Sequence, residues 1–564
     1  MRSTSLRLAI AGLFGSVLLV PALSAAKPPN PPPAPLTCAA LTAPDSDLLG
    51  TPGVKSATAS IIAAAGANVA HCRVDILYGT NPDQNINVRV GLPLNSIDGG
   101  TGGVQGAWNG RTQGIGGGGC SGSLAVNAPV NARYVGSGSD AGHTGGNCEP
   151  GVNLDGTYND QFINDFIRNG MKQQILLSKA VTNTYYALEP AYNYWNGCST
   201  GGRQGYVLAQ ELPKELDGIL ANAPAIYWTR FQTAQMWGQI AMLELNLGPI
   251  SAAKLSQATA SAVAACDGAD GVVDGVIDDP RTCSFSATAN VCGTPTAPAA
   301  NCLTANEATA IDKIWDGPRN AKGAKVWFGL DRGTNLSSLN GTNPFGLGVT
   351  QFHWDEHDRT FDWKTVTMAE YPDVHQDGSR NIADVTDTFD DLKKFEKSGG
   401  KLLTLVGAND QLIMPRGVIN YYREQATRGH KTDFEKQQEF YRLFRVPGAA
   451  HCAVPNAFAQ LVDWVENGNA PEAIINTTTV GGVTRTRLLC PYPKKAIYNG
   501  TGDTNSSANY HCGGDLETTA TVCADVLAKY KHEVDSKPDY HDDGVKKKEC
   551  EGKPVKDDDD DDED

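Results

Sequence analysis

A serine inside a glycine-rich pentapeptide is the residue with the clearest potential for chemistry in this chain. Residues 197–201 read Gly-Cys-Ser-Thr-Gly, which matches the pattern Gly-x-Ser-x-Gly around Ser199. The small residues of this pattern allow a strained turn from a strand into a helix, and the turn exposes the serine hydroxyl as a nucleophile. Residues 192–196 fit the strand, and residues 204–212 fit the helix. The pentapeptide is only moderately specific by itself, so its chemistry depends on partners.

An acid and a histidine follow the serine in the order that a hydrolase of this kind requires. Asp410 comes directly after the apolar segment 401–406, and His451 comes soon after the segment 440–446. Both residues therefore fall on loops at strand ends, where such sheets carry catalytic groups. Taken singly, Asp410 fits a helix cap and His451 fits an exposed loop. Together and in this order, the three residues predict a Ser-His-Asp triad.

Each end of the predicted nucleophile–base pair has a cysteine beside it. Cys198 precedes Ser199, and Cys452 follows His451. A disulfide between the two cysteines would hold their Cα atoms about 5.5–6 Å apart and bring the serine and the histidine close to hydrogen-bonding reach. Two independent free thiols are the alternative.

The elements around these residues indicate an α/β fold, because strand and helix patterns alternate along the chain. Strands are predicted at 86–92, 401–406 and 440–446, and amphipathic helices at 415–428 and 455–467. Residues 227–387 differ in character, with four cysteines, many Trp and Asn residues and only short periodic segments. We interpret this region as a lid inserted between the nucleophile and the acid.

These loops resemble the tannase/feruloyl esterase family, which includes tannin acyl hydrolases, feruloyl esterases and the enzyme that hydrolyses mono-(2-hydroxyethyl) terephthalate. The resemblance rests on residues 197–203, the Asp410 loop and residues 447–452, and it covers roughly residues 38–512, including 72–74, 108–111 and 490–493. One departure is Val406 before Gly407, where many members have a histidine at a position that is not catalytic. The resemblance implies an α/β-hydrolase sheet with a large lid domain.

The implied function is that of a secreted serine carboxylic ester hydrolase acting on small aromatic acid esters, such as gallate or ferulate esters, through an acyl-enzyme. Hydrolysis of terephthalate-type or other aryl and alkyl esters stays open as an alternative. So does a non-catalytic secreted protein that binds its partners with the help of Ca²⁺. The aromatic residues of the predicted lid suit an aromatic acid, but they could equally form the lid's own core. These residues are Trp228, Phe231, Trp315, Trp327, Phe345, Trp354 and Trp363.

A run of glycines at residues 114–119 predicts backbone donors for an oxyanion. The run formally contains Gly-x-Gly-x-x-Gly, but no helix-forming segment follows it, as a nucleotide site would require. Backbone N–H groups without side chains can instead approach a developing negative charge. Similarity to the family indicates Gly117 and Gly118, and the N–H of Thr200 is expected to be the second donor.

A second glycine-rich segment, residues 267–276, predicts a cation site, because three aspartates in eight residues can supply oxygen ligands to a hard cation. The spacing does not match an EF-hand. The resemblance implies a structural Ca²⁺ held by the side chains of Asp267, Asp270 and Asp274 and the carbonyls of Val272 and Val276. A solvated acidic turn is the alternative. No organic cofactor is expected.

A pair of histidines four residues apart, His353 and His357, has the spacing of zinc ligands on one helix face. No third ligand is evident, and a polar lid surface is the preferred interpretation.

Fourteen cysteines indicate an oxidising compartment. Pairing cannot be deduced from counts alone. The resemblance implies the pairs Cys198–Cys452, Cys266–Cys283, Cys292–Cys302 and Cys490–Cys512, and less directly Cys38–Cys72 and Cys120–Cys148. Cys523 and Cys550 remain as a last pair.

The ends of the chain complete the predicted organisation. Residues 1–26 have the layout of a secretory signal peptide, whose apolar stretch is too short to span a bilayer. The predicted order is signal peptide 1–26, Pro-rich linker 27–36, hydrolase domain 37–226, lid 227–387, hydrolase domain 388–512 and an extension with an acidic tail 513–564. We expect secretion to the cell exterior or the periplasm and no membrane insertion after signal removal. A net charge of −16 argues against nucleic acid as a partner. The oligomeric state stays open.

Overall fold

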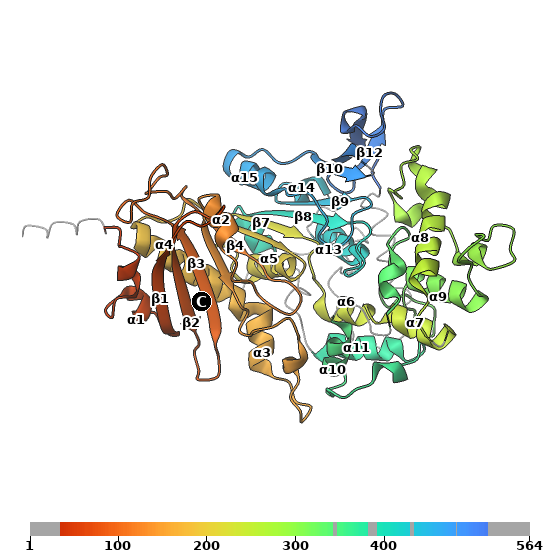
Figure 1. Ribbon diagram of the computed structural model, residues 1–564, viewed down its shortest axis with the longest axis horizontal. Helices are drawn as coiled ribbons and strands as arrows, with labels where there is room; N and C mark the ends of the chain where they lie inside the picture. The colour runs from red at the N-terminus through yellow and green to blue at the C-terminus, as the bar shows by residue number, and fades with distance from the viewer. Residues whose placement is uncertain are drawn as a thin grey trace, which may run out of the picture. The chain divides into compact units, whose positions relative to one another are not determined.

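A sheet of nine strands organises the chain, with the strand order β1-β2-β3-β5-β4-β6-β7-β8-β9 (Figure 1). The computed structural model describes residues 34–246, 248–341, 347–381, 392–428, 434–480 and 482–516. The predicted signal peptide, most of the Pro-rich linker, the pair Cys523 and Cys550 and the acidic tail lie outside the described residues. The described residues from Pro35 onward belong to one compact unit.

The sheet combines an antiparallel edge with a parallel body. Strands β1 to β3 pair antiparallel, β3 also pairs antiparallel with β5, and the strands from β5 to β9 run parallel to one another. The strands are β1 Val54–Ile62, β2 His71–Tyr78, β3 Ile86–Pro93, β4 Arg111–Ile115, β5 Val135–Ser139, β6 Tyr192–Cys198, β7 Gly218–Asn222, β8 Lys401–Gly407 and β9 Tyr441–Val446. The predicted α/β fold is confirmed.

Both faces of the parallel body are covered by helices and buried. Because successive side chains of a strand point to opposite faces, each strand contributes to both buried layers. Leu402 of β8 and Leu443 of β9 pack in the cluster that also contains residues of α4, α5 and α13. Leu403 and Phe444 pack in a separate cluster with residues of α15. The helices outside the region between β7 and β8 are α1 Asp47–Gly50, α2 Asn127–Asn131, α3 Asp160–Asn164, α4 Gly170–Tyr186, α5 Thr200–Glu211, α13 Pro415–Arg428, α14 Phe434–Gln437 and α15 Phe458–Asn467.

The chain between β7 and β8, residues 223–400, is called the inserted segment below; it contains the predicted lid. Its helices are α6 Trp228–Ala234, α7 Trp237–Asn246, α8 Ala252–Cys266, α9 Ala305–Asp316, α10 Gly348–Asp355, α11 Tyr371–Asn381 and α12 Leu392–Lys397. Figure 1 shows α6 to α11 gathered on one side of the sheet. The N-termini of two of these helices are set by capping residues. Ser251 caps α8, and Thr304 forms a capping box with Glu307 at α9.

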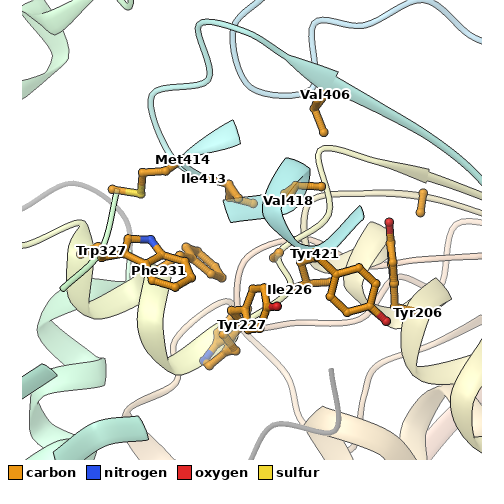
Figure 2. Close-up of a cluster of buried hydrophobic side chains, with 14 of the residues drawn as sticks. Tyr206, Ile226, Tyr227, Phe231, Trp327, Val406, Ile413, Met414, Val418 and Tyr421 are labelled. Carbon is orange, nitrogen blue, oxygen red and sulfur yellow. The ribbon is translucent and has the colours of Figure 1, made fainter. Parts of the chain in front are cut away.

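The aromatic residues of the inserted segment belong to buried packing. Trp228, Phe231, Trp315, Trp327, Trp354 and Trp363 are all buried, and Phe345 lies outside the described residues. Figure 2 shows Phe231 and Trp327 in one cluster with Tyr206 of α5 and Tyr421 of α13. The cluster joins the inserted segment to the body of the fold, so these rings stabilise that junction.

Two small hairpins follow the main sheet. Strands β10 Ile474–Val480 and β11 Val483–Leu489 pair antiparallel, as do β12 Lys495–Tyr498 and β13 Tyr510–Gly513. In the described part of the chain, no helix has the length and apolar character needed to cross a bilayer.

Candidate active site

Ser199 lies between the end of β6 and the start of α5, in a backbone conformation that L residues rarely adopt, with φ 62° and ψ −125°. In such a turn the backbone before Ser199 lies close to the backbone after it. A Cβ on Gly197 would lie 2.4 Å from the carbonyl carbon of Gly201, which explains the glycine at 197. The helix begins at Thr200, earlier than the predicted 204, because tertiary packing outweighs the low helix propensity of the glycines that follow.

Asp410 and His451 form a close pair. Oδ2 of Asp410 lies 2.7 Å from Nδ1 of His451, and Oδ1 accepts hydrogen bonds from the N–H groups of Leu412 (2.8 Å) and Ile413 (2.9 Å). Asp410 is only 2% exposed, so these donors compensate the loss of water around its charge. A carboxylate beside Nδ1 favours the proton on that nitrogen and leaves Nε2 as the acceptor.

The loops that carry the pair are joined to each other. They follow β8 and β9, which are parallel neighbours, so both loops leave the same edge of the sheet. Oε1 of Gln411 accepts the backbone N–H of His451 at 3.1 Å, and the N–H of Asn409 donates to the carbonyl of Ala449 at 2.9 Å. The position of the imidazole is therefore fixed from the acid loop as well as from its own.

A disulfide joins Cys198 to Cys452, with Cα atoms 6.0 Å apart. The bridge thus connects the residue before Ser199 to the residue after His451. Within the described residues, no hydrogen bond links Ser199 Oγ to His451 Nε2. Catalytic hydrogen bonds are often long without substrate and shorten in the reactive complex.

The glycine loop after β4 lies beside the start of α5. The N–H of Gly117 donates to Oε1 of Gln204 at 2.9 Å, and Oγ1 of Thr200 donates to the carbonyl of Gly119 at 2.5 Å. The N–H of Gly117 is therefore engaged and is not a free donor. Among the described residues, no acceptor takes a hydrogen bond from the N–H of Gly118 or of Thr200, so these two remain as candidate oxyanion donors.

The acidic loop 267–276 folds around the first of its aspartates. The carboxylate of Asp267 accepts the N–H groups of Asp274 (3.1 Å), Gly275 (2.7 Å) and Val276 (3.3 Å). Oδ1 of Asp270 accepts the N–H of Val272 at 2.9 Å. The carboxylates of Asp267 and Asp270 therefore stabilise the turns of this loop.

The charges of this loop are unevenly compensated. Burial raises the pKa of Asp270, and the charges of Asp278 and Asp274 raise it further. Asp274 forms an ion pair with Arg487 of β11. With the carboxylates turned to backbone and arginine, no set of three or more metal-ligating side chains converges within the described ranges. The candidate ligands of this loop are nevertheless all oxygen atoms, which hard cations prefer. A bound cation would also offset the repulsion between the carboxylates, so the residue types fit a hard cation.

The two histidines with zinc spacing have separate partners. Nδ1 of His353 lies 3.0 Å from a carboxylate oxygen of Glu149, and Nδ1 of His357 lies 3.1 Å from the carbonyl of Gly156. Their rings therefore join the inserted segment to the body of the fold at two different points, and they do not form a zinc site.

Six disulfides link all twelve cysteines that the structure describes. They are Cys38–Cys72, Cys120–Cys148, Cys198–Cys452, Cys266–Cys283, Cys292–Cys302 and Cys490–Cys512. Sequence reasoning missed two residues that hold the site, Gln204 and Gln411. Both stand close to a predicted catalytic residue in the sequence, but nothing in their spacing shows that their amides reach across to another loop.

Comparison with known proteins identifies the family of the chain. Residues 104–513 match the family model for tannase and feruloyl esterase. A probable feruloyl esterase of Arthroderma benhamiae is 35% identical over 445 residues, which cover 72% of this chain and 81% of that protein. An uncharacterized esterase of Xanthomonas campestris is 30% identical over 409 residues, or 62% of this chain and 70% of that protein.

Solved structures show the same fold. Feruloyl esterase B from Aspergillus oryzae aligns with a TM-score of 0.70 at 24% identity, over 82% of this chain and 97% of that one. Tannin acyl hydrolase from Aspergillus niger aligns with a TM-score of 0.70 at 21% identity, over 83% and 92%. The predicted α/β-hydrolase sheet is therefore confirmed. Because the family model spans most of the chain and a relative shares 35% of its residues over 72% of it, this chain belongs to the tannase and feruloyl esterase family and is a carboxylic ester hydrolase.

Proposed function

We propose that this esterase hydrolyses aromatic acid esters, such as ferulate or gallate esters, with Ser199 as nucleophile, His451 as general base and Asp410 as the residue that orients the imidazole. The observation that carries the roles is the buried pair of Asp410 and His451, 2.7 Å apart, bridged through Cys452 and Cys198 to the strained turn at Ser199. The substrate class is supported by the similarity to feruloyl esterases and to a tannin acyl hydrolase.

The proposed reaction proceeds in two steps. Nε2 of His451 takes the proton of Ser199 Oγ as the oxygen attacks the ester carbonyl, and the resulting imidazolium returns that proton to the leaving alcohol. The acyl-enzyme is then attacked by a water that Nε2 deprotonates, which releases the acid and restores the serine. Asp410 stabilises the imidazolium in both steps, because its Oδ2 faces Nδ1.

The developing oxyanion would be stabilised by backbone N–H groups. We assign this role to Thr200 and Gly118, since the N–H of Gly117 is bonded to Gln204. Such donors act strongly because they are already oriented before the charge develops.

The inserted segment is proposed to act as a lid over this site. Its contacts with β9 and with the loop that carries His451 support this role. Asp279 accepts a hydrogen bond from Arg445 of β9 at 3.2 Å, and a Cβ on Gly448 would lie 3.0 Å from Val276. The inserted segment therefore packs against β9 and the loop that carries His451.

A hydrolysis panel tests the substrate class. We expect the kcat/KM for methyl ferulate or methyl gallate to exceed that for ethyl butyrate at least tenfold, because a pocket shaped for an aromatic acid gains apolar contact that a short chain lacks. Mono-(2-hydroxyethyl) terephthalate is the third aromatic ester, and the matched ferulic amide is the control for peptidase-type activity. A preference for ethyl butyrate would contradict the aromatic proposal, and preference for the terephthalate ester would redirect it to the alternative substrate.

We also propose that the acidic loop holds one structural Ca²⁺. Asp267, Asp270 and Asp274 would contribute carboxylate oxygens, and Val272 and Val276 carbonyl oxygens. Such an ion would supply positive charge to a loop whose carboxylates repel one another, and it would take no part in the ester chemistry.

Chelation tests the calcium proposal. After treatment with EDTA and desalting, CaCl₂ at about 100 times its Kd should raise Tm by about 5 °C, since such binding adds about 2.7 kcal/mol and 1 kcal/mol corresponds to about 2 °C in a large domain. MgCl₂ is the control ion, and the Asp270→Asn variant should respond less than the parent. A Tm that does not change with Ca²⁺ would contradict a cation site in this loop.

Secretion is proposed as well. The six disulfides of the described chain require an oxidising environment in which to form and persist, as the cell exterior and the periplasm provide.

A further inference from the structure

Helix α10 of the inserted segment holds a short stretch of the main fold, residues 148–158. The indole N–H of Trp354 donates to the carbonyl of Cys148 at 2.9 Å, and the hydroxyl of Tyr158 donates to the carbonyl of Trp354 at 3.1 Å. Trp354 is 1% exposed. A Cβ on Gly151 would lie 2.1 Å from the indole ring, so the ring packs directly against the backbone there.

The same stretch is covalently attached to the glycine loop of the candidate active site. Cys148 forms a disulfide with Cys120, with Cα atoms 5.3 Å apart. Cys120 directly follows Gly119, whose carbonyl accepts the hydroxyl of Thr200. The indole of Trp354 is thus connected to the oxyanion loop through one backbone carbonyl and one disulfide.

A second route leads from Trp354 to the same cysteine. Its ring meets that of Phe162 edge-on at 6.4 Å, and Phe162 lies 4.4 Å from the ring of His143. Nε2 of His143 lies 2.5 Å from the carbonyl oxygen of Cys120, which makes it the donor to that carbonyl. Both routes therefore end at Cys120.

Hydrogen bonds rather than side-chain packing hold the tip of the glycine loop, because the carbonyl of Gly117 accepts the N–H of Gly201 at 2.9 Å and that of Gly118 accepts the hydroxyl of Ser121 at 2.8 Å. A Cβ on Gly118 would meet no atom within 4 Å, and one on Gly119 would meet a single atom at 3.8 Å. Glycines also lose the most backbone freedom when they are held in one conformation. The position of the Gly118 N–H therefore depends on Gly117, which is bonded to Gln204 and Gly201, and on Ser121, which directly follows the disulfide-bonded Cys120.

We propose that Trp354 is a positioning residue for the oxyanion hole. By holding residues 148–158 it fixes Cys120, and through Cys120 it fixes the N–H of Gly118 relative to that of Thr200. This inference rests on the proposed function, because it assigns the oxyanion to these two N–H groups. It also means that docking of the inserted segment through α10 completes the catalytic geometry.

The Trp354→Phe variant tests the proposal, because phenylalanine keeps an aromatic ring against Gly151 but cannot donate to Cys148. With 4-nitrophenyl acetate we expect kcat to fall about 10- to 100-fold, short of the 10²–10³ that loss of a whole oxyanion donor costs. KM should stay within about twofold, because ground-state binding does not need the oxyanion donors. An aryl trifluoromethyl ketone, which forms an oxyanion on Ser199, should lose affinity by the same factor as kcat.

Trp237→Phe is the matched control. Its indole N–H donates to the carbonyl of Lys313 at 2.8 Å inside the inserted segment, so the substitution removes a similar bond that does not involve residues 148–158. We expect this variant to keep its kcat and its affinity for the ketone. Labelling of the wild-type protein at Ser199 by paraoxon is measured first; its absence would overturn the proposed function and the inference with it.

Three results would overturn the positioning role while the proposed function stands. One is an unchanged kcat and ketone affinity in Trp354→Phe; another is an equal loss in Trp237→Phe. If Trp354→Phe does not fold, the double variant Cys120→Ala/Cys148→Ala tests the same proposal. It should show the same parallel loss of kcat and ketone affinity, and a double variant with wild-type ketone affinity would be the third contradicting result.

Discussion

The Ser199→Ala variant is expected to hydrolyse esters with a kcat roughly 10⁴–10⁶-fold below that of the wild type, the range measured for serine triads. Alanine removes the only atom proposed to attack the carbonyl, whereas the oxyanion donors at Gly118 and Thr200 remain. Residual activity above the uncatalysed rate is therefore expected. The measurement is kcat on the best ester of the hydrolysis panel, together with intact mass after reaction with paraoxon.

Ser178→Ala is the matched control for this variant. Ser178 is a buried serine of α4 whose hydroxyl has no hydrogen-bond partner among the described residues. Its removal should leave kcat unchanged and paraoxon labelling intact. If Ser199→Ala retained near-wild-type activity or took up paraoxon, the nucleophile would have to be another residue and the proposed mechanism would be wrong.

The double variant Cys198→Ala/Cys452→Ala is expected to lose about 10²-fold in kcat. Ser199 and His451 come from different strands, and the bridge fixes one to the other with Cα atoms of its cysteines 6.0 Å apart. Without it, a displacement of about 1 Å between nucleophile and base suffices for a loss of this size. The measurement is kcat per folded molecule, at a temperature where near-UV circular dichroism shows native packing.

The bridge between Cys292 and Cys302 supplies the control for this prediction. It closes a loop of the inserted segment with a sequence separation of only 10, against 254 for the bridge at the site. Both double variants should be less stable than the wild type, since each loses a cross-link that constrains the unfolded chain. Only the variant at Cys198 and Cys452 should lose kcat. An unchanged kcat there would show that the bridge contributes stability alone.

Several features of this protein could be read directly from the sequence, because they depend on neighbours in the chain. The pattern around Ser199 predicts a strand followed by a helix, and the structure has β6 and α5 there. The apolar segments before Asp410 and His451 predict strands, which are β8 and β9. Parallel neighbouring strands end at one edge of a sheet, so the acid and the histidine meet. The family assignment, drawn from these motifs, is confirmed by the comparisons.

Other features could not be read from the sequence, because they arise between residues far apart in the chain. Gly117 was a predicted oxyanion donor, yet its N–H is bonded to Gln204, 87 residues away. The tryptophans of the inserted segment fitted either an acyl pocket or a core by residue type, and the structure buries them in packing. Residue type gives the chemistry that a side chain can do, but not the partner that it finds.

The sequence by itself therefore determined the family, the order of the candidate catalytic residues and the elements that carry them, since strand and helix patterns and short motifs are local. The tertiary structure alone decided which backbone N–H groups beside Ser199 find no acceptor among the described residues, how Gln411 reaches the backbone of His451, and how Trp354 is connected to the glycine loop. These contacts depend on packing across the sheet and the inserted segment, and packing joins residues whose spacing in the chain carries no signal of their contact.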